Sequence, residues 1–348
     1  MVRSTSSWLL VGTGVVLFAC SSAAGDTTNP ADACAGYAAA LKDGAQACGR
    51  YVVAPEREAE LAARLQKSCT TALRAPGSGI TPSVLTSCAD KLRTACGDAD
   101  ACDELATAGR LADGARCGAD GQCASDDCQR PSGSGCGSCV ARVPIGGACG
   151  GAASEAHCAR GATCLAQGAG PGTCTEVVKL AEGEVCYDPT KPGSTASCAE
   201  GLACRTEGGV SGAVKCARRG VAGAPCTSDA ECPTNLACVA KTCGAPAQDG
   251  APCTSSSQCA SGACSEALEK CVAVQWIAAG GACDGNVKRC VRGTCVSADS
   301  SGAERKCMDP IADGAPCTAA SSSSGARCDK YASCVDGTCQ IFDPSTCQ

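Results

Sequence analysis

Residues 223–243, GAPCTSDAECPTNLACVAKTC, hold four cysteines, and residues 250–264, GAPCTSSSQCASGAC, begin the next such group. In both groups, four or five residues separate the second cysteine from the third. The same spacing recurs in seven groups of four cysteines, which we call quartets 1 to 7. They open at Cys117, Cys149, Cys186, Cys226, Cys253, Cys283 and Cys317. The spacing between the second and third cysteines is nearly constant, whereas the outer loops vary in length. This pattern predicts one disulfide-linked scaffold, repeated over residues 113–344.

The cysteine content also indicates the compartment and the source of stability. The chain of 348 residues has 37 cysteines, whereas aromatic residues make up only 2%. Because large apolar side chains are scarce in the quartets, disulfides must supply much of their stability, at roughly 3 kcal/mol each. Such cysteine density is typical of exported proteins in an oxidising compartment. The net charge of −6 disfavours nucleic acid as a partner.

The first residues predict export and lipid anchoring. Residues 1–19 contain one basic residue, Arg3, and an apolar run that is too short to span a membrane. The stretch Leu17-Phe18-Ala19-Cys20 resembles the lipobox of bacterial lipoproteins, which implies that Cys20 carries diacylglycerol and an amide-linked acyl chain such as palmitate. Ser21 resembles the Gram-negative sorting signal for the outer membrane. Cleavage after Ala24, with loss of Cys20, is the alternative.

Two regions lie between this leader and the quartets. Residues 20–32 are small and polar without periodicity, which predicts a flexible tether. Residues 33–110 place apolar residues and cysteines three and four positions apart, which predicts a bundle of three to four helices. A disulfide between two helices requires cysteines at the same level along the helix axes. This condition predicts the disulfides Cys34–Cys69, Cys48–Cys96 and Cys88–Cys102. Cys69 and Cys88 also lie at the same level of the bundle, so a Cys69–Cys88 bond is an alternative.

Within a quartet, four cysteines allow three pairings. We favour bonds from the first cysteine to the third and from the second to the fourth, because this pattern interlocks the loops. In quartets 4 and 5 these bonds are Cys226–Cys238, Cys232–Cys243, Cys253–Cys264 and Cys259–Cys271. Each quartet should hold a short hairpin or two. In cysteine and glycine spacing, the quartets resemble the repeats of Dickkopf N-terminal and EB-type extracellular modules, and this resemblance implies protein binding.

Two cysteines are left over by this pairing. Residues 117–139 contain a fifth cysteine, Cys136, and the tail at residues 345–348 contains Cys347. Either the quartets curl into a compact ring around the helices so that Cys136 bonds to Cys347, or both ends keep free thiols or form intermolecular bonds. Because a disulfide requires Cα atoms within about 7 Å, only the curled arrangement brings these two sulfurs together.

Residues suited to catalysis or metal binding are scarce. The single histidine, His157, has no recognisable nucleophile partner. Zinc sites built from cysteine need thiolates, which an oxidising compartment removes. The motif Cys136-Gly-Ser-Cys139 does not follow a strand and open a helix, and Asp126-Asp127 lack the spacing of a calcium loop. We therefore expect no cofactor, no metal and no enzyme activity, and a hydrolase is disfavoured.

Together these features predict a small disulfide-rich protein: a non-enzymatic lipoprotein of the cell envelope, held in the outer membrane by its N-terminal lipid. Its quartets would bind a protein partner or form a structural stalk. The alternative is a protease-inhibitor-like protein, because rigid disulfide-linked loops suit insertion into a protease cleft. The sequence identifies neither the partner nor the membrane face on which the protein lies.

Overall fold

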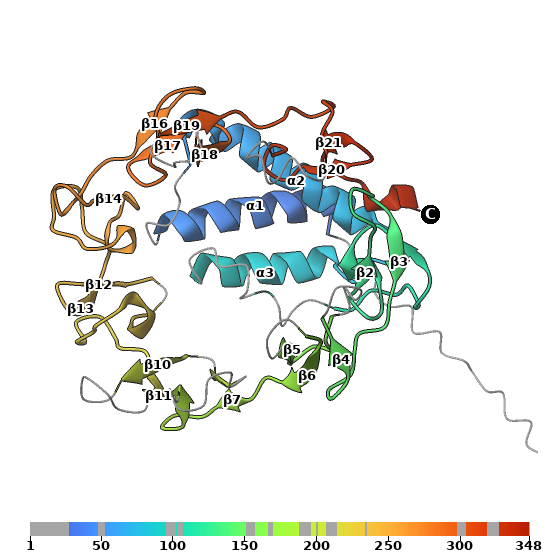
Figure 1. Ribbon diagram of the computed structural model, residues 1–348, viewed down its shortest axis with the longest axis horizontal. Helices are drawn as coiled ribbons and strands as arrows, with labels where there is room; N and C mark the ends of the chain where they lie inside the picture. The colour runs from blue at the N-terminus through green and yellow to red at the C-terminus, as the bar shows by residue number, and fades with distance from the viewer. Residues whose placement is uncertain are drawn as a thin grey trace, which may run out of the picture.

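The computed structural model describes residues 28–47, 53–94, 102, 107–150, 157–165, 170–187, 196–199, 201–206, 214–233, 235–297, 304–318 and 327–347. These residues form three α-helices and many short, mainly antiparallel strand pairs, cross-linked by disulfides. The helices lie in the centre of Figure 1 and the strands surround them. We call residues 28–110 the hub and residues 111–347 the ring. Among the described residues, no helix has the length and apolarity needed to cross a membrane.

The hub contains the helices α1 (Pro30–Ala47), α2 (Glu58–Arg74) and α3 (Pro82–Thr94), with the 3-10 turn η1 (Pro55–Arg57) before α2. Helix α1 lies against α3 and buries Ala40, Ala89 and Leu92 in a small apolar core. Cys34 bonds to Cys69, and Cys88 bonds to Cys102, as the heights along the bundle led us to expect. The rival Cys69–Cys88 bond is therefore absent. The expected Cys48–Cys96 bond lies outside the described residues and stays a prediction.

Helix α1 begins earlier than the sequence pattern indicated. It starts at Pro30, so residues 30–32 are helical and do not belong to the flexible tether. Asn29 is the cause, because its Oδ1 accepts the N–H of Ala31 and its carbonyl accepts the N–H of Ala33, both at 3.0 Å. An asparagine cap followed by proline in the first turn starts a helix. The leader at residues 1–19 and Cys20 lie outside the described residues.

Every quartet of the ring has the same two disulfides. The first cysteine bonds to the third in Cys117–Cys128, Cys149–Cys164, Cys186–Cys204, Cys226–Cys238, Cys253–Cys264, Cys283–Cys295 and Cys317–Cys334. The second bonds to the fourth in Cys123–Cys139, Cys158–Cys174, Cys198–Cys216, Cys232–Cys243, Cys259–Cys271, Cys290–Cys307 and Cys328–Cys339. This is the interlocked pattern that we favoured.

The third and fourth cysteines of each quartet face each other on two antiparallel strands. These pairs are β2 (Cys128–Gln129) with β3 (Gly137–Cys139), β5 (Ala162–Leu165) with β6 (Gly172–Glu176), β10 (Leu202–Thr206) with β11 (Val214–Arg218), β12 (Ala237–Val239) with β13 (Thr242–Gly244), β14 (Cys264–Ser265) with β15 (Lys270–Cys271), β18 (Thr294–Ser297) with β19 (Arg305–Met308), and β20 (Ser333–Val335) with β21 (Thr338–Gln340). The expected short hairpins are therefore present.

Additional strands extend these hairpins or join neighbouring segments. The antiparallel additions are β1 (Arg116–Cys117) on β3, β4 (Ala148–Cys149) on β6, and β8 (Val185–Tyr187) on β11. The parallel pairs are β7 (Lys179–Leu180) with β9 (Ser197–Cys198), and β16 (Gln275–Ile277) with β17 (Lys288–Cys290). Short 3-10 turns occur at η3 (Asp120–Gln122), η4 (Asp229–Glu231), η5 (Ser256–Gln258) and η7 (Pro344–Cys347).

A glycine three residues before the first cysteine closes each quartet. These opening glycines are Gly114, Gly146, Gly183, Gly223, Gly250, Gly280 and Gly314, with φ between 80° and 91°. Each donates its N–H to the carbonyl of the fourth cysteine at 2.7 or 2.8 Å, and the fourth cysteine donates back to the residue after the glycine. Glycine adopts this left-handed conformation without the steric cost of a Cβ. The two bonds close the quartet whatever the length of its outer loops.

The residue three positions before each opening glycine lies beside the second cysteine. Six quartets show a parallel bridge, in the pairs Leu111–Cys123, Val143–Cys158, Leu180–Cys198, Ala247–Cys259, Ile277–Cys290 and Ile311–Cys328. In quartet 4, the N–H of Gly220 donates instead to the carbonyl of Glu231 at 2.8 Å. The segment linking two quartets is thus bound into the second of them, which fixes the direction in which the chain continues.

The two ends of the ring meet and are covalently joined. Cys136 bonds to Cys347 across a sequence separation of 211, with Cα atoms 5.3 Å apart. The N–H of Asp336 donates to the carbonyl of Gly133 at 2.7 Å beside this bond. All described cysteines are in disulfides, so neither leftover sulfur is a free thiol. The quartets therefore form a closed ring around the hub (Figure 1).

Candidate functional site

Quartet 1 is attached to the hub by backbone contacts that leave no room for larger residues. The N–H of Gly79 donates to the carbonyl of Gly121 at 2.8 Å, and the buried Gln122 donates from Nε2 to the carbonyl of Pro76 at 2.8 Å. A Cβ at Gly109 would overlap the backbone carbonyl group of Gln122. This close approach fixes the start of the ring against the hub.

Helix α2 and η1 are attached to the other end of the ring by ion pairs, which we call the clasp. Arg57 Nη2 lies 3.0 Å from both carboxylate oxygens of Asp329. Arg64 forms a bidentate pair with Asp313 at 2.8 and 2.9 Å, and Arg292 pairs with Glu60. Forked pairing of arginine with carboxylate fixes orientation as well as distance. Quartets 6 and 7 are therefore held in register with the hub.

The Arg57–Asp329 pair is the buried member of the clasp. Arg57 is 4% exposed and Asp329 is 7% exposed. Burial disfavours the charged form of Asp329, but hydrogen bonds from Arg57 and from the backbone N–H of Lys330 outweigh it and hold the pKa of Asp329 below its usual value. The carboxylate is consequently ionised at neutral pH, and its charge is balanced by Arg57.

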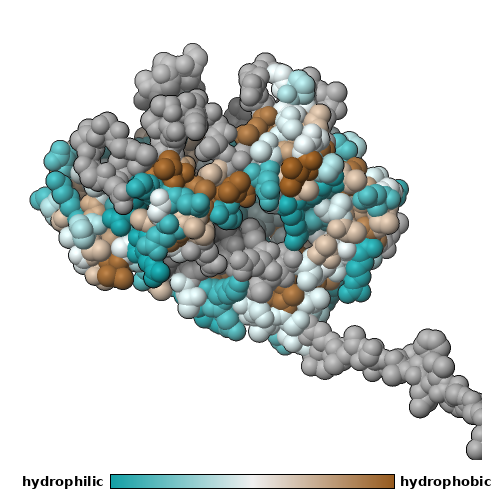
Figure 2. Space-filling model, turned by 90° about the horizontal axis from the view of Figure 1, so that it is seen from below, coloured by the Kyte–Doolittle hydropathy of each residue, from teal (hydrophilic) through white to brown (hydrophobic). Residues whose placement is uncertain are grey.

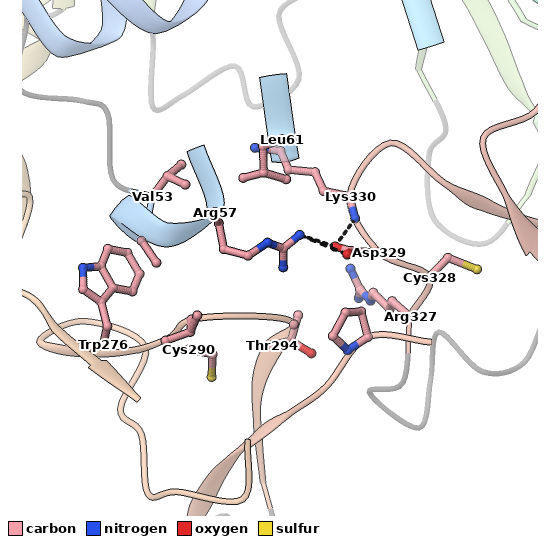
Figure 3. Close-up of a pocket in the computed structure, with 14 residues that line it drawn as sticks. Val53, Arg57, Leu61, Trp276, Cys290, Thr294, Arg327, Cys328, Asp329 and Lys330 are labelled. Atoms are coloured by element: carbon pink, nitrogen blue, oxygen red, sulfur yellow. Dashed lines mark hydrogen bonds and ion pairs between the residues drawn. The ribbon is translucent and has the colours of Figure 1, made fainter. Parts of the chain in front are cut away.

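A cavity of about 310 Å³ lies between the hub and quartets 6 and 7, beside the clasp (Figure 3). Val53, Ala54 and Leu61 form the hub side, and Trp276 lies at one end. The ring contributes Cys290, Val291, Gly293, Thr294, Pro310, Arg327, Cys328, Asp329 and Lys330. An apolar cavity with a few converging polar groups is the usual form of a small-molecule site, although this volume is at the lower end of the usual range.

The residues that the sequence singled out for chemistry do not converge on this cavity. His157 Nδ1 lies 3.1 Å from both oxygens of Asp127 and its side chain is exposed, whereas Asp126 pairs with Arg142 and Arg160. Cys136 and Cys139 bond to different partners, so they are not a redox dithiol. The clusters of three cysteine sulfurs within quartets are all in disulfides and offer no thiolate to a metal.

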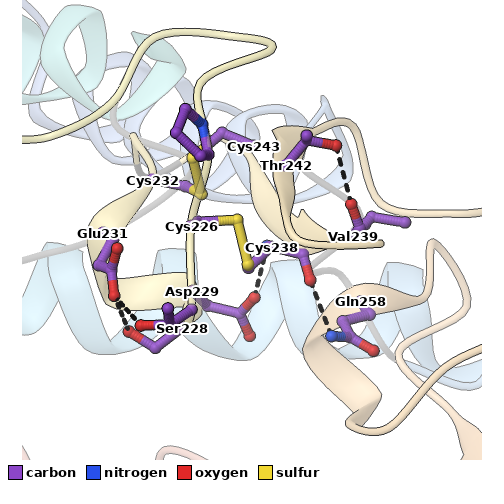
Figure 4. Close-up of a disulfide and its surroundings, with 12 residues drawn as sticks. Cys226, Ser228, Asp229, Glu231, Cys232, Cys238, Val239, Thr242, Cys243 and Gln258 are labelled. Carbon is purple, nitrogen blue, oxygen red and sulfur yellow. Dashed lines mark hydrogen bonds between the residues drawn. A yellow bond between two sulfur atoms is a disulfide. The ribbon is translucent and has the colours of Figure 1, made fainter. Parts of the chain in front are cut away.

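Quartets 2 to 5, residues 143–272, take up the left and lower parts of the ring in Figure 1, and we call them the arc. Contacts between neighbouring quartets link the described residues of the arc. In quartet 4, Asp229 Oδ1 accepts the N–H of Cys238 at 2.6 Å, while Gln258 of quartet 5 donates to the carbonyl of Cys238 at 2.8 Å (Figure 4). Arg205 of quartet 3 pairs with Glu231 of quartet 4 at 2.9 Å.

The arc also carries most of the exposed large aliphatic side chains in the described residues. Five of them are Ile145, Val178, Val185, Val221 and Leu268, of which Val221 is 74% exposed and Leu268 is 63% exposed. Figure 2 views the molecule from the lower edge of Figure 1 and shows apolar atoms among hydrophilic ones on this side. These side chains are distributed over quartets 2 to 5, where they are accessible for contact with a protein partner.

Comparison with known proteins found no matching family model, no matching curated protein and no matching solved structure.

Sequence reasoning did not find the clasp or the cavity. Arg57 and Asp329 are 272 residues apart, and no local pattern connects them. A readable signal was present for the bridges that attach each linking segment to the following quartet, in the residues three positions before the opening glycines. Most of these are large aliphatics, as in Leu111, Ile277 and Ile311.

Proposed function

We propose that this chain is a non-enzymatic lipoprotein of the cell envelope whose quartets are copies of one module and whose arc binds a protein partner. The observation that carries the proposal is the Cys136–Cys347 bond. A closed ring cannot extend away from the membrane as a stalk would, so closure favours a binding surface over a spacer. The exposed aliphatics of the arc supply apolar groups for such a surface.

Rigidity of the arc supports the same proposal. A surface held by two disulfides per quartet loses little conformational entropy when a partner binds, which favours affinity. Val221 and Leu268 project from loops that their quartets hold in place, so they can act as anchors without rearrangement. We expect a few such residues to contribute most of the binding free energy.

Lipid anchoring is the second part of the proposal and rests on Leu17-Phe18-Ala19-Cys20. An outer-membrane location follows from the resemblance of Ser21 to the sorting signal. Mass spectrometry of the mature chain should show diacylglycerol and acyl mass at Cys20, and the Cys20→Ser variant should lack it. A mature amino terminus at Gly25 without acyl mass would contradict anchoring through Cys20.

The binding proposal is tested by reversible cross-linking in intact envelopes followed by affinity capture. We expect one stoichiometric partner, with recovery reduced about tenfold by Val221→Asp and by Leu268→Asp, since each variant places a charge in an apolar contact. Ser138→Asp, an exposed position in quartet 1, is the matched control and should leave recovery unchanged. Equal recovery with all three variants would contradict a binding surface on the arc.

The same material tests the inhibitor alternative. An inhibitor should block a protease while one exposed loop of a quartet stays uncut, whereas a binding module should block none. Protease assays on the purified protein, followed by mapping of cleavage sites, distinguish the two.

A further inference from the structure

The cavity beside the clasp contains cationic groups that the fold does not use. Within the described part of the chain, Arg57 Nη1 has no hydrogen-bond partner, because Asp329 engages Nη2 and Nε lies 3.0 Å from Glu60 Oε2. Figure 3 shows this second terminal nitrogen turned away from Asp329, toward Thr294. The fully buried Arg57 atom without a hydrogen bond is Nε, whereas Nη1 is not fully buried and can donate to an acceptor brought by a ligand.

Two further cations border the same cavity. Arg327 is exposed, and its guanidinium makes no hydrogen bond or ion pair with any described residue. The ammonium of Lys330 lies 5.4 Å from the centre of the Tyr331 ring. Since Arg57 already balances the charge of Asp329, Arg327 and Lys330 leave a local positive excess in a chain whose net charge is −6. This excess selects for an anion.

The rest of the lining is apolar and rigid. Trp276 and Leu61 offer apolar surface within reach of these cations, and Pro310 adds to it. The ring side is fixed by the disulfides Cys290–Cys307 and Cys328–Cys339. Preformed walls lower the ordering cost of binding, so even a small ligand can bind there.

We propose that this cavity binds the carboxylate of a ligand that also carries an apolar group. The carboxylate lies between Arg57 Nη1 and Arg327, and the apolar group lies against Trp276. Such chemistry belongs both to small organic acids and to the carboxyl terminus of a polypeptide with an apolar last residue. The site is separate from the arc, so it stands whether or not the arc binds a partner.

Tryptophan fluorescence gives a direct test, because Trp8 and Trp276 are the two tryptophans of the chain. Trp8 lies in the leader that the proposed processing removes, so emission of the mature chain, or of the full chain carrying Trp8→Phe, reports on Trp276 alone. We expect N-acetyl-leucine to shift this emission to saturation. N-acetyl-leucinamide should bind at least about tenfold more weakly, because it lacks the charge that strengthens the hydrogen bonds. The peptide Ala-Ala-Leu identifies the source: tighter binding than N-acetyl-leucine indicates a polypeptide terminus, and weaker binding indicates a free acid.

Variants separate the site from a nonspecific response. Arg327→Gln should weaken binding of N-acetyl-leucine about tenfold, and Lys330→Gln should weaken it less. Both side chains are exposed, so the fold should be unaffected. Arg116→Gln removes an exposed arginine of quartet 1 outside the cavity and should bind normally. Equal responses to the acid and the amide, unchanged binding by Arg327→Gln, or no response to any of the three probes would overturn the proposal.

Discussion

The hub and the ring have cores of different composition. In the hub, Ala40, Ala89 and Leu92 lie with Cys88 in an apolar cluster between two helices. In the ring, the buried clusters of quartets 1, 4 and 5 consist of four cysteines each, with one partly buried apolar residue against them. The hub thus combines side-chain packing with disulfides, whereas the ring has cystine sulfur where other domains have leucine and phenylalanine.

This difference shows how a chain with few aromatic residues can still form a large ordered structure. Each quartet needs only two disulfides, an opening glycine and two backbone hydrogen bonds to define its centre. The hub instead needs helices long enough to bury an apolar face. The two regions should therefore respond differently to reduction, substitution and pH.

Full reduction should separate the two regions most strongly. With thiol reductant and alkylation at neutral pH, we expect residues 113–347 to lose protease resistance, because the buried clusters of the ring are cystines. Helices α1 to α3 should keep most of their far-UV circular dichroism signal after reduction. As a fraction of the starting value, the loss of this signal should be smaller than the ring's loss of protease protection. Limited proteolysis with mass spectrometry provides the measurement, with alkylated but unreduced protein as the control. A ring that stays protected after complete reduction would show that packing, and not cystine, holds it.

Opening the ring should have the next largest effect. The double variant Cys136→Ser, Cys347→Ser removes a bond that spans 211 residues, which by loop entropy costs up to about 5 kcal/mol. We expect a larger radius of gyration by small-angle scattering and a lower midpoint in guanidinium. The matched control, Cys232→Ser with Cys243→Ser, removes a bond spanning 11 residues, should cost about 3 kcal/mol and should leave the ring closed. Identical scattering from both variants would contradict closure.

The clasp should be sensitive to loss of one buried charge. Asp329→Asn removes the buried carboxylate that pairs with Arg57 and leaves only the more exposed Glu60 beside it, which costs about 3 kcal/mol in a buried pair. Hydrogen exchange in η1 and quartet 7 should increase, while exchange in the arc should not. Arg93→Gln, which breaks the exposed Arg93–Asp90 pair, is the control and should change stability by less than about 1 kcal/mol. Comparable losses in the two variants would mean that the clasp is not the buried contact between hub and ring.

Lowering the pH should weaken the clasp, as the Asp329→Asn substitution does. The pKa of Asp329 is lower in the folded chain than in the unfolded chain, so its ionisation stabilises the folded state at neutral pH. That contribution is fully present above the unfolded value, about 4, and is lost as the pH falls through the folded value. The protection factors of the η1 amides, which are observed exchange rates corrected for the intrinsic rate at each pH, should fall between pH 6 and pH 3 in the native chain. In Asp329→Asn the pH dependence should be smaller, and an unchanged dependence would point to another carboxylate.

A single opening glycine should give the smallest effect. Gly250 has φ of 91° with open space around the position of a Cβ, so Gly250→Ala costs only the left-handed strain, about 1 kcal/mol. Gly244 also has open space but no positive φ, so Gly244→Ala should be close to neutral. Guanidinium unfolding of the two variants measures the difference. Equal stabilities would mean that backbone conformation at Gly250 does not close the quartet.

Much of the disulfide framework could be predicted because cysteine positions carry it directly. Heights along the helices led to Cys34–Cys69. The count of sulfurs left Cys136 and Cys347 either as a ring-closing pair or as two separate ends, and the structure shows the pair. The start of α1 at Pro30 was missed, although Asn29 before a proline is a readable capping signal. The short hairpins could also be predicted from the sequence, because each depends on residues close together in the chain.

The candidate site depends on curvature, and curvature is not a local property. Five of the six links between quartets form a parallel bridge, as at Ile277 beside Cys290, and only the combined path of all the links places Asp329 against Arg57. Trp276 shows the same difficulty, because a lone tryptophan in a linker does not indicate whether it will face solvent or a cavity. Long-range ion pairs therefore required the three-dimensional structure.

The position of the Cys136–Cys347 bond has a consequence for biosynthesis. Cys347 follows the seventh quartet, so its partner Cys136 must wait while more than two hundred residues are translocated and oxidised. During that interval Cys136 lies three positions from Cys139 and can compete with it for Cys123. An oxidative folding machinery that acts in order of emergence would trap this mispairing, whereas one that reshuffles bonds would resolve it. Maturation of this chain should thus depend on a disulfide isomerase as well as on an oxidase.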